Sequence, residues 1–265
     1  MTLMRVGLIA CAAVPWLLCH LGAAELKKET IAAFDNYIRS AEARIAGQVS
    51  GKRSFLWVDE SPPRLEQVKK GQAIAQPWNS RGEVQVADGL IHDWIGAVFI
   101  PGTSLSKVLA LVRDYDNHYK IYQPEVMASK ILEHDQDHYR VYLRLLKKKI
   151  ITAVLNTEHD INYYPLSATR CHSRSYSTRI AQVADAGRPG EHELPVGNDS
   201  GFLWRLYSYW RFEERDGGVY MECQAISLTR DIPTGLGWLI EPVIRELPKD
   251  SLLRTLEGTR RALAR

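Results

Sequence analysis

The chain has 265 residues, of which 45% are hydrophobic and 25% are charged, and its formal net charge is +3. These are ordinary values for a globular protein, so the composition excludes disordered and collagen-like classes. The basic residues are scattered, and this pattern predicts no nucleic-acid partner. Seven Trp and twelve Tyr against five Phe favour either a pocket or interface wall, or aromatic pairs across the strands of a sheet.

The first 24 residues have the pattern of a secretory signal peptide. Arg5 is followed by a mostly apolar run over residues 6–19, and small residues precede Glu25. We expect cleavage after Ala24 and an exported protein, either periplasmic or secreted. Retention as a membrane anchor is the less favoured alternative, because a span needs about 20 apolar residues.

Residues 25–80 are predicted to form an N-terminal helix and an extended connector. Apolar side chains recur at steps of three and four over residues 26–46, on one helical stripe. Residues 52–80 contain three prolines and two tryptophans, which favours an extended segment that wraps the main body. Because this part is too small to bury a core of its own, we interpret it as an appendage.

Residues 81–265 are predicted to form the main domain. Residues 90–100 are rich in Ile, Val, Trp and Phe and indicate a strand, and Thr103 or Ser104 can cap the helix that follows. Further strands are expected near residues 125–134, 139–147, 150–163, 168–183, 202–214 and 219–231. Residues 234–264 indicate a long amphipathic helix, with Pro248 marking a kink or a restart.

The Asp216-Gly217 pair predicts the register of one hairpin. A two-residue loop at this point places Arg211 opposite Glu222 and Trp210 opposite Cys223. The apolar face of the hairpin should then look inward. The opposite face, expected to be exposed, contains Arg205, Tyr207, Tyr209 and Arg211, and Arg170 and Arg174 are expected to join it.

Two cysteines, Cys171 and Cys223, follow the signal peptide, and an oxidising compartment would permit a disulfide. If the strand near 168–183 pairs with the strand near 202–214, the two cysteines lie two strand spacings apart. That distance is about 9 to 10 Å, beyond the limit of about 7 Å between bridged Cα atoms. We therefore expect two free, buried thiols.

A curled sheet covered by one helix leaves a concavity that the helix fills only in part. The inner face of the strand near 168–183 offers small residues, namely Cys171, Ser173, Ser175 and Ser177. Opposite Trp210, Phe212 and Met221, this pattern predicts a cavity. In the alternative, Trp238 and Leu239 of the last helix fill the gap.

The order of elements from 82 to 264 resembles the START-like, or helix-grip, superfamily. The stretch 228–256, in which Asp231, Ile232 and Pro233 lead from a strand into a helix, resembles its coenzyme-Q-binding and polyketide-cyclase branch. Segments 88–101 and 227–242 are similar to uncharacterised exported bacterial proteins of that branch. The resemblance implies an α+β fold, a curved antiparallel sheet wrapped around a long C-terminal helix, with a hydrophobic cavity between them and no shared catalytic residues.

Several polar clusters are candidates for chemistry. His134 and His138 flank an acidic turn, which is a candidate metal site, but a solvated turn is the commoner explanation. His92 is a candidate general base, although a hydrogen-bonded strand histidine is commoner. The run from Lys147 to Lys149 suggests either a basic turn that contacts anionic headgroups of a membrane or, by default, a solvated turn. The sequence predicts no catalytic residue, metal or cofactor.

The favoured hypothesis is a binding protein for an apolar or amphipathic small molecule, lipid-like or quinone-like. The alternatives are a cyclase- or hydrolase-type enzyme using the same cavity, and an envelope interaction protein with a filled core. The predicted ligand-binding residues are Trp94, Ser173, Ser175, Trp210, Phe212, Met221, Cys223 and Trp238.

Overall fold

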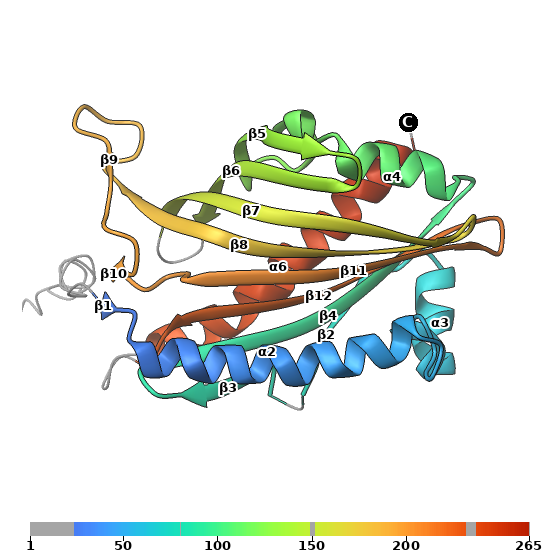
Figure 1. Ribbon diagram of the computed structural model, residues 1–265, viewed down its shortest axis with the longest axis horizontal. Helices are drawn as coiled ribbons and strands as arrows, with labels where there is room; N and C mark the ends of the chain where they lie inside the picture. Colours follow the sequence, from blue (N-terminus) through green and yellow to red (C-terminus); the bar gives the residue numbers. More distant parts are fainter. Residues whose placement is uncertain (1–23, 80, 149–151, 232–236, 265) are drawn as a thin grey trace, which may run out of the picture.

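The protein is built in three layers, with helices on both faces of one curved sheet (Figure 1). The computed structural model describes residues 24–79, 81–148, 152–231 and 237–264, and within 237–245 the backbone alone. The α+β fold predicted from the sequence, with a large antiparallel sheet, a C-terminal helix and an N-terminal helix, is confirmed.

The main sheet is antiparallel throughout its described pairs, in the order β2-β4-β12-β11-β8-β7-β6-β5, with β3 beside β4 and β9 beside β8. Its strands are β2 (Ile74–Pro77), β3 (Glu83–Val86), β4 (Gly89–Pro101), β5 (Val126–Asp135), β6 (His138–Lys148), β7 (Thr152–Ser167), β8 (Arg170–Ala184), β9 (His192–Glu193), β11 (Arg205–Arg215) and β12 (Gly218–Arg230). A separate short pair joins β1 (Ala24–Glu25) to β10 (Asn198–Asp199).

The helices are α2 (Lys28–Val49), α3 (Pro62–Lys69), α4 (Leu105–Arg113), α5 (His118–Ile121) and α6 (Gly237–Leu263), with short 3-10 turns η1 (Trp57–Glu60) and η2 (Tyr115–Asn117). Helix α6 continues through Pro248. None of the helices in the described ranges is long and apolar enough to cross a membrane.

The β11–β12 hairpin has the predicted register. Arg211 pairs with Glu222 and Trp210 with Cys223. Asp216 and Gly217 both adopt positive φ, 55° and 75°, as a tight hairpin turn of this type requires. A slip of one residue would reverse the two faces of both strands, so the turn determines which side chains look inward.

Helix α6 packs on the concave face of the sheet. Leu252 and Leu256 lie in one buried cluster with Val98 of β4 and Met221 of β12. The approach to β4 is close at Gly96, where an added Cβ would lie 3.0 Å from side-chain atoms of both leucines. The second half of α6 is therefore fixed over β4.

The N-terminal helix is present as predicted, but it is packed against the sheet instead of forming an appendage. Phe34, Ile38, Ala41 and Ile45 of α2 are buried against the convex face, and Phe34 is 0% exposed. Their partners on the sheet are Ile91, Trp204, Tyr209, Ile226 and Leu228. The segment before residue 80 thus supplies the third layer.

The prediction of an extended connector over residues 52–80 is wrong in its local structure, because η1 and α3 lie within it. The Glu222 carboxylate explains how this segment is held: it accepts hydrogen bonds from the backbone N–H groups of Trp57 and Val58, both at 2.8 Å. Arg211 pairs with the same carboxylate at 3.3 Å. A buried ion pair therefore joins the hairpin to the N-terminal segment.

The expectation of an exposed arginine–tyrosine face is also wrong. Arg211 and Tyr209 are each 1% exposed, because α2 and η1 cover this part of the convex face. Arg174 and Arg205 are half-buried, and Arg170, near the end of the hairpin, keeps an exposed side chain.

The two described cysteines are free and buried, as the strand spacing predicted. Cys171 of β8 lies opposite Phe212 of β11, and Cys223 of β12 lies opposite Trp210 of β11. Strand β11 separates them.

Candidate functional site: a cavity between the sheet and the C-terminal helix

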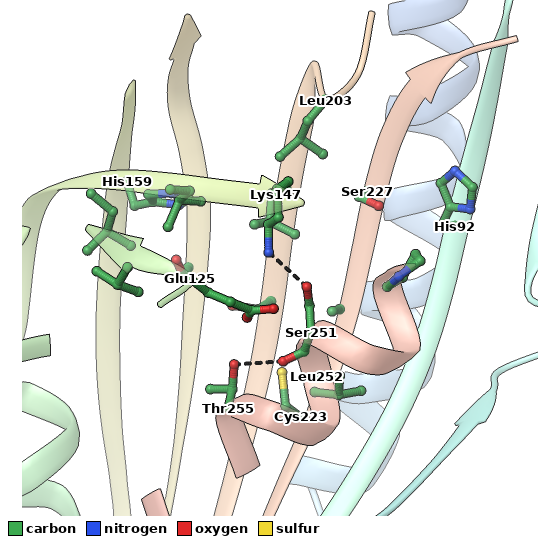
Figure 2. Close-up of a pocket in the computed structure, with 18 of the residues that line it drawn as sticks. His92, Glu125, Lys147, His159, Leu203, Cys223, Ser227, Ser251, Leu252 and Thr255 are labelled. Atoms are coloured by element: carbon green, nitrogen blue, oxygen red, sulfur yellow. Dashed lines mark hydrogen bonds between the residues drawn. The ribbon is translucent and has the colours of Figure 1, made fainter. Parts of the chain in front are cut away.

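A cavity of about 520 Å³ lies between the inner face of the sheet and the second half of α6. Strands β6, β7, β8, β11 and β12 form its wall, α6 and α5 border it, and the loop before β11 contributes Phe202 and Leu203. Figure 2 shows labelled lining residues from β4, β6, β7, β12 and α6 directed toward a common space. Its volume falls within the range of pockets for drug-sized ligands, about 300 to 1,000 Å³.

The cavity exists because small side chains meet across the middle of the sheet. Ser175 of β8 pairs with Ser208 of β11, which pairs in turn with Ala225 of β12, and all three line the cavity. Helix α6 packs mainly on β4, β2 and β12, so it leaves the inner face of the central strands uncovered. Neither the sheet nor the described part of the helix fills this volume.

Five of the eight residues predicted to bind a ligand line this cavity: Ser173, Ser175, Trp210, Phe212 and Cys223. Trp94 and Met221 do not, although both are on the inner face. They are packed into the buried cluster that contains Leu252 and Leu256, because α6 covers their part of the sheet. The side chains of Trp238 and Leu239 lie outside the described residues, so the filling of the gap by these two stays untested. Contact of the five lining residues with a ligand stays a prediction.

Three histidines in the lining are held neutral by burial. Burial lowers the pKa of His92, His118 and His159 to about 4 in each case. Each ring has one short polar contact from Nε2: to Thr229 Oγ1 at 3.1 Å, to the Val112 carbonyl at 3.1 Å and to Thr157 Oγ1 at 3.0 Å, respectively. At neutral pH these rings present uncharged polar edges in a mostly apolar wall.

A thiol and two tyrosine hydroxyls of the wall also stay protonated. Burial raises the pKa of the Cys223 thiol and of the Tyr115 and Tyr163 hydroxyls. The two tyrosine hydroxyls are 2.7 Å apart and hydrogen-bonded to each other. The Tyr163 hydroxyl also donates to the Val112 carbonyl at 3.4 Å. Burial disfavours the anionic, nucleophilic forms of these groups.

His92 lies in the cavity, where the enzyme hypothesis requires a base. Its pKa of about 4 makes it a weak base, and its Nε2 contacts a threonine hydroxyl instead of a carboxylate that would orient and charge the ring. The neighbouring Asp93 points to the opposite face, where it accepts hydrogen bonds from Tyr37 and Gln224.

The other histidines singled out in the sequence lie elsewhere. His134 contacts the Gln136 carbonyl within its own turn, and His138 pairs with Asp160 at 2.8 Å. Among the residues that the structure describes, no group of three or more His, Cys, Asp or Glu is arranged to hold a metal ion.

The sequence interpretation of Lys147 as part of a turn is wrong. Instead of lying in a solvated turn, it is on β6 and its side chain points into the cavity (Figure 2). Its Nζ donates a hydrogen bond to Ser251 Oγ of α6 at 2.8 Å. Burial lowers the pKa of Lys147, and the Glu125 carboxylate partly opposes this effect. Lys148, the next residue, is exposed.

The sequence contains a signal for two of the missed lining residues. Lys147 follows Tyr139, Val141, Leu143 and Leu145 at a spacing of two, so it shares their inward face. His159 stands in the same relation to Leu155 and Ile161 on β7. For the loop residues Phe202 and Leu203 there is no comparable periodic signal.

Comparison with known proteins finds similar folds among solved structures, but no similar sequence family. No protein-family model matches the chain, and no curated protein matches it. Among solved structures, a STAR-related lipid transfer protein from Xanthomonas axonopodis is 17% identical with a TM-score of 0.47, covering 72% of this chain and all of that one.

Two further solved structures are similar to the same degree. A protein from Thermus thermophilus is 14% identical with a TM-score of 0.47, covering 64% of this chain and 96% of its own. An aromatase/cyclase from a Streptomyces species is 14% identical with a TM-score of 0.44, covering 66% and 94%. These similarities concern the arrangement of sheet and helix, and none of them assigns a ligand or a reaction to this chain.

Proposed function

We propose that this protein is an exported binding protein that holds an apolar or amphipathic small molecule, lipid-like or quinone-like, between its sheet and its C-terminal helix. The observation that supports the proposal most directly is the cavity of about 520 Å³ with a mostly apolar wall. Such a site binds by removing apolar surface from water, at about 25 cal/mol per Å², and needs only a few polar anchors.

The chemistry of the wall favours binding over catalysis. Its histidines are neutral with a pKa of about 4, and burial keeps its thiol and tyrosine hydroxyls protonated. A set of neutral hydrogen-bonding groups suits the orientation of a guest more than the transfer of a proton at neutral pH.

Export belongs to the same proposal and is supported by the signal-peptide pattern of residues 1–24. The mature chain should then begin at Glu25, which the intact mass of the protein purified from its host would report. In an envelope compartment the protein would take up its ligand by peripheral contact with a membrane, and the exposed Lys148 has the charge for such a contact.

Binding can be tested with the neutral apolar fluorophore N-phenyl-1-naphthylamine. We expect saturable fluorescence enhancement in the wild-type protein and its loss in Ser175→Phe, because Ser175 is in the cavity wall and a phenyl ring there takes up the space of the guest.

The matched control is Thr178→Phe, which puts the same ring at an exposed position of the same strand. This variant should bind as the wild type does, provided that both variants retain the wild-type melting transition. Equal enhancement in the wild type and in folded Ser175→Phe would show that the fluorophore binds elsewhere, and the proposal would be wrong.

A further inference from the structure

We propose that the cavity selects single-chain amphiphiles with an anionic head group, held as a carboxylate by the ammonium of Lys147. This inference rests on the proposed function and specifies the chemical class of the ligand. It is based on the position of one cation in a mostly apolar wall and on the way in which the charges around it are paired.

The Lys147 ammonium is directed into the cavity with free donor capacity. It projects from the inner face of β6 toward α6, where its Nζ donates to Ser251 Oγ at 2.8 Å (Figure 2). An ammonium has three N–H donors. Within the described part of the chain this is the one hydrogen bond of the Nζ, so two donors stay available to a guest.

The carboxylate that acts electrostatically on Lys147 is paired with another cation. Glu125 also lines the cavity, but its Oε1 forms an ion pair at 3.2 Å with Nε of Arg254, which lies on α6. Among the described residues, no ion pair within 4.0 Å joins Glu125 to Lys147. Arg254 also pairs with Asp250 at 3.9 Å, so both of these carboxylates are engaged by Arg254 and neither is bonded to the Lys147 ammonium in the described part of the chain.

The other charged residues of the described lining, Arg230 and Asp231, are of opposite sign and both have partners. The three histidines are neutral. Lys147 is therefore the cation of the described wall that has a neutral hydroxyl, and no carboxylate within 4.0 Å, as its partner.

Ser251 provides the second contact that a carboxylate needs. Because its Oγ accepts the bond from Lys147, its own proton is free to be donated to a guest oxygen. Its backbone carbonyl is occupied by Thr255 Oγ1 at 2.9 Å, which holds this turn of α6 in place. A carboxylate can receive one bond from the ammonium and one from the serine hydroxyl.

Burial makes an anion preferable to a neutral head group at this position. An ammonium removed from water loses hydration that a hydroxyl group restores only in part, whereas a carboxylate adds a charge-assisted hydrogen bond. The apolar chain of the guest would extend along Trp210, Phe212 and Leu206. A volume of about 520 Å³ suits one such chain.

The test compares dodecanoate with 1-dodecanol, which have the same chain length, as competitors of N-phenyl-1-naphthylamine at pH 7.5. In the wild-type protein we expect dodecanoate to bind about 10-fold more tightly or better, as one charge-assisted bond predicts. In Lys147→Met the preference should disappear while dodecanol still binds. Lys148→Met, one residue further on and exposed, should retain the preference.

Equal affinities of the two compounds in the wild-type protein would overturn this inference and leave the binding function intact. A preference that survives in Lys147→Met would overturn it as well. If neither compound displaces the fluorophore, the proposed function itself fails. Dodecyl phosphate is the third arm: tighter binding than dodecanoate would reject the carboxylate as the head group.

Discussion

Burial determines the protonation of the polar residues in the cavity wall. His159 is 5% exposed and His92 is 1% exposed, and both have a pKa of about 4 instead of 6.5. A buried imidazolium in this wall would lack the carboxylate that normally stabilises it, because each ring contacts a threonine hydroxyl. Because the unfolded chain takes up protons that the folded chain does not, these neutral rings lower the free energy of unfolding in acid.

The substitution His159→Gln should make the protein less sensitive to acid. Above pH 6.5 the ring is neutral in both states, so its full contribution to stability is present. As the pH falls from 6.5 to about 4, the unfolded chain is protonated first and the free energy of unfolding decreases. Removing this group should reduce the loss at pH 4 by about 3 kcal/mol, at about 1.4 kcal/mol per pKa unit. Urea unfolding at pH 7.5 and pH 4 measures the difference.

The measurement at pH 7.5 is the internal control, because it gives the cost of the substitution itself. Burial raises the pKa values of Asp93 and Glu222, so these two groups increase the free energy of unfolding as the pH falls. This increase is the same in the wild type and in His159→Gln. If the free energy of unfolding fell equally between pH 7.5 and pH 4 in the wild type and in His159→Gln, the ring would be protonated in the folded protein, contrary to this account.

At the scale of residues, the sequence predicts those residues of the cavity wall that lie on strands, because alternate side chains of a strand face the same side of the sheet. Ser173 and Ser175 were assigned to the inner face by alternation alone, and both are there. The same rule applies to Lys147, but a run of three lysines suggested a solvated turn. Trp94 and Met221 lie on the inner face, as alternation predicts, but they do not line the cavity because α6 covers them. Which part of the sheet α6 covers depends on tertiary packing, which the sequence of one strand does not determine.

At the scale of elements, the N-terminal helix has a structural role that its sequence does not reveal. The apolar stripe of α2 packs on the convex face of β12 and β11. The hairpin register predicts which side chains lie on that face, but not that α2 covers them. With α2 and η1 in place, the convex face of β4, β11 and β12 is covered. The N-terminal layer thus stabilises the wall of the cavity from behind.

The substitution Phe34→Ala tests this role. Phe34 is 0% exposed and contacts Tyr207 edge-on, with ring centroids 5.3 Å apart. Loss of a fully buried phenyl ring should lower the free energy of unfolding of the whole protein by about 3 to 5 kcal/mol. Asp35→Ala, the adjacent exposed position, should change it by less than about 0.5 kcal/mol. Unfolding of α2 alone, with an unchanged main transition, would show that the helix is peripheral.

The strands and the long helix were predicted closely because their signals are local. Periodicity of two, the turn at Asp216 and Gly217, and the apolar stripe near the C-terminus each lie within one element. The connector was misread because prolines favour extended chain as well as the first turn of a helix, and Pro62 begins α3. Its burial depends on Glu222, which is far away in sequence and pairs with Arg211 on the hairpin face that the sequence predicts to be exposed.

At the scale of the molecule, the cavity follows from an unequal covering of the sheet. The convex face is covered by α2, η1 and α3, whereas on the concave face α6 packs mainly over β4, β2 and β12 (Figure 1). The inner face of β7, β8 and β11 is left to small residues and to the cavity.

Native mass spectrometry of the protein purified from its own host tests the central claim most directly. We expect a bound apolar or amphipathic compound that appears as a discrete mass above that of the polypeptide and is released by organic extraction. Ser175→Phe should lack this mass, and Thr178→Phe should retain it. A wild-type protein that carries no such compound, and takes up none when incubated with a lipid extract of the host, would contradict the account.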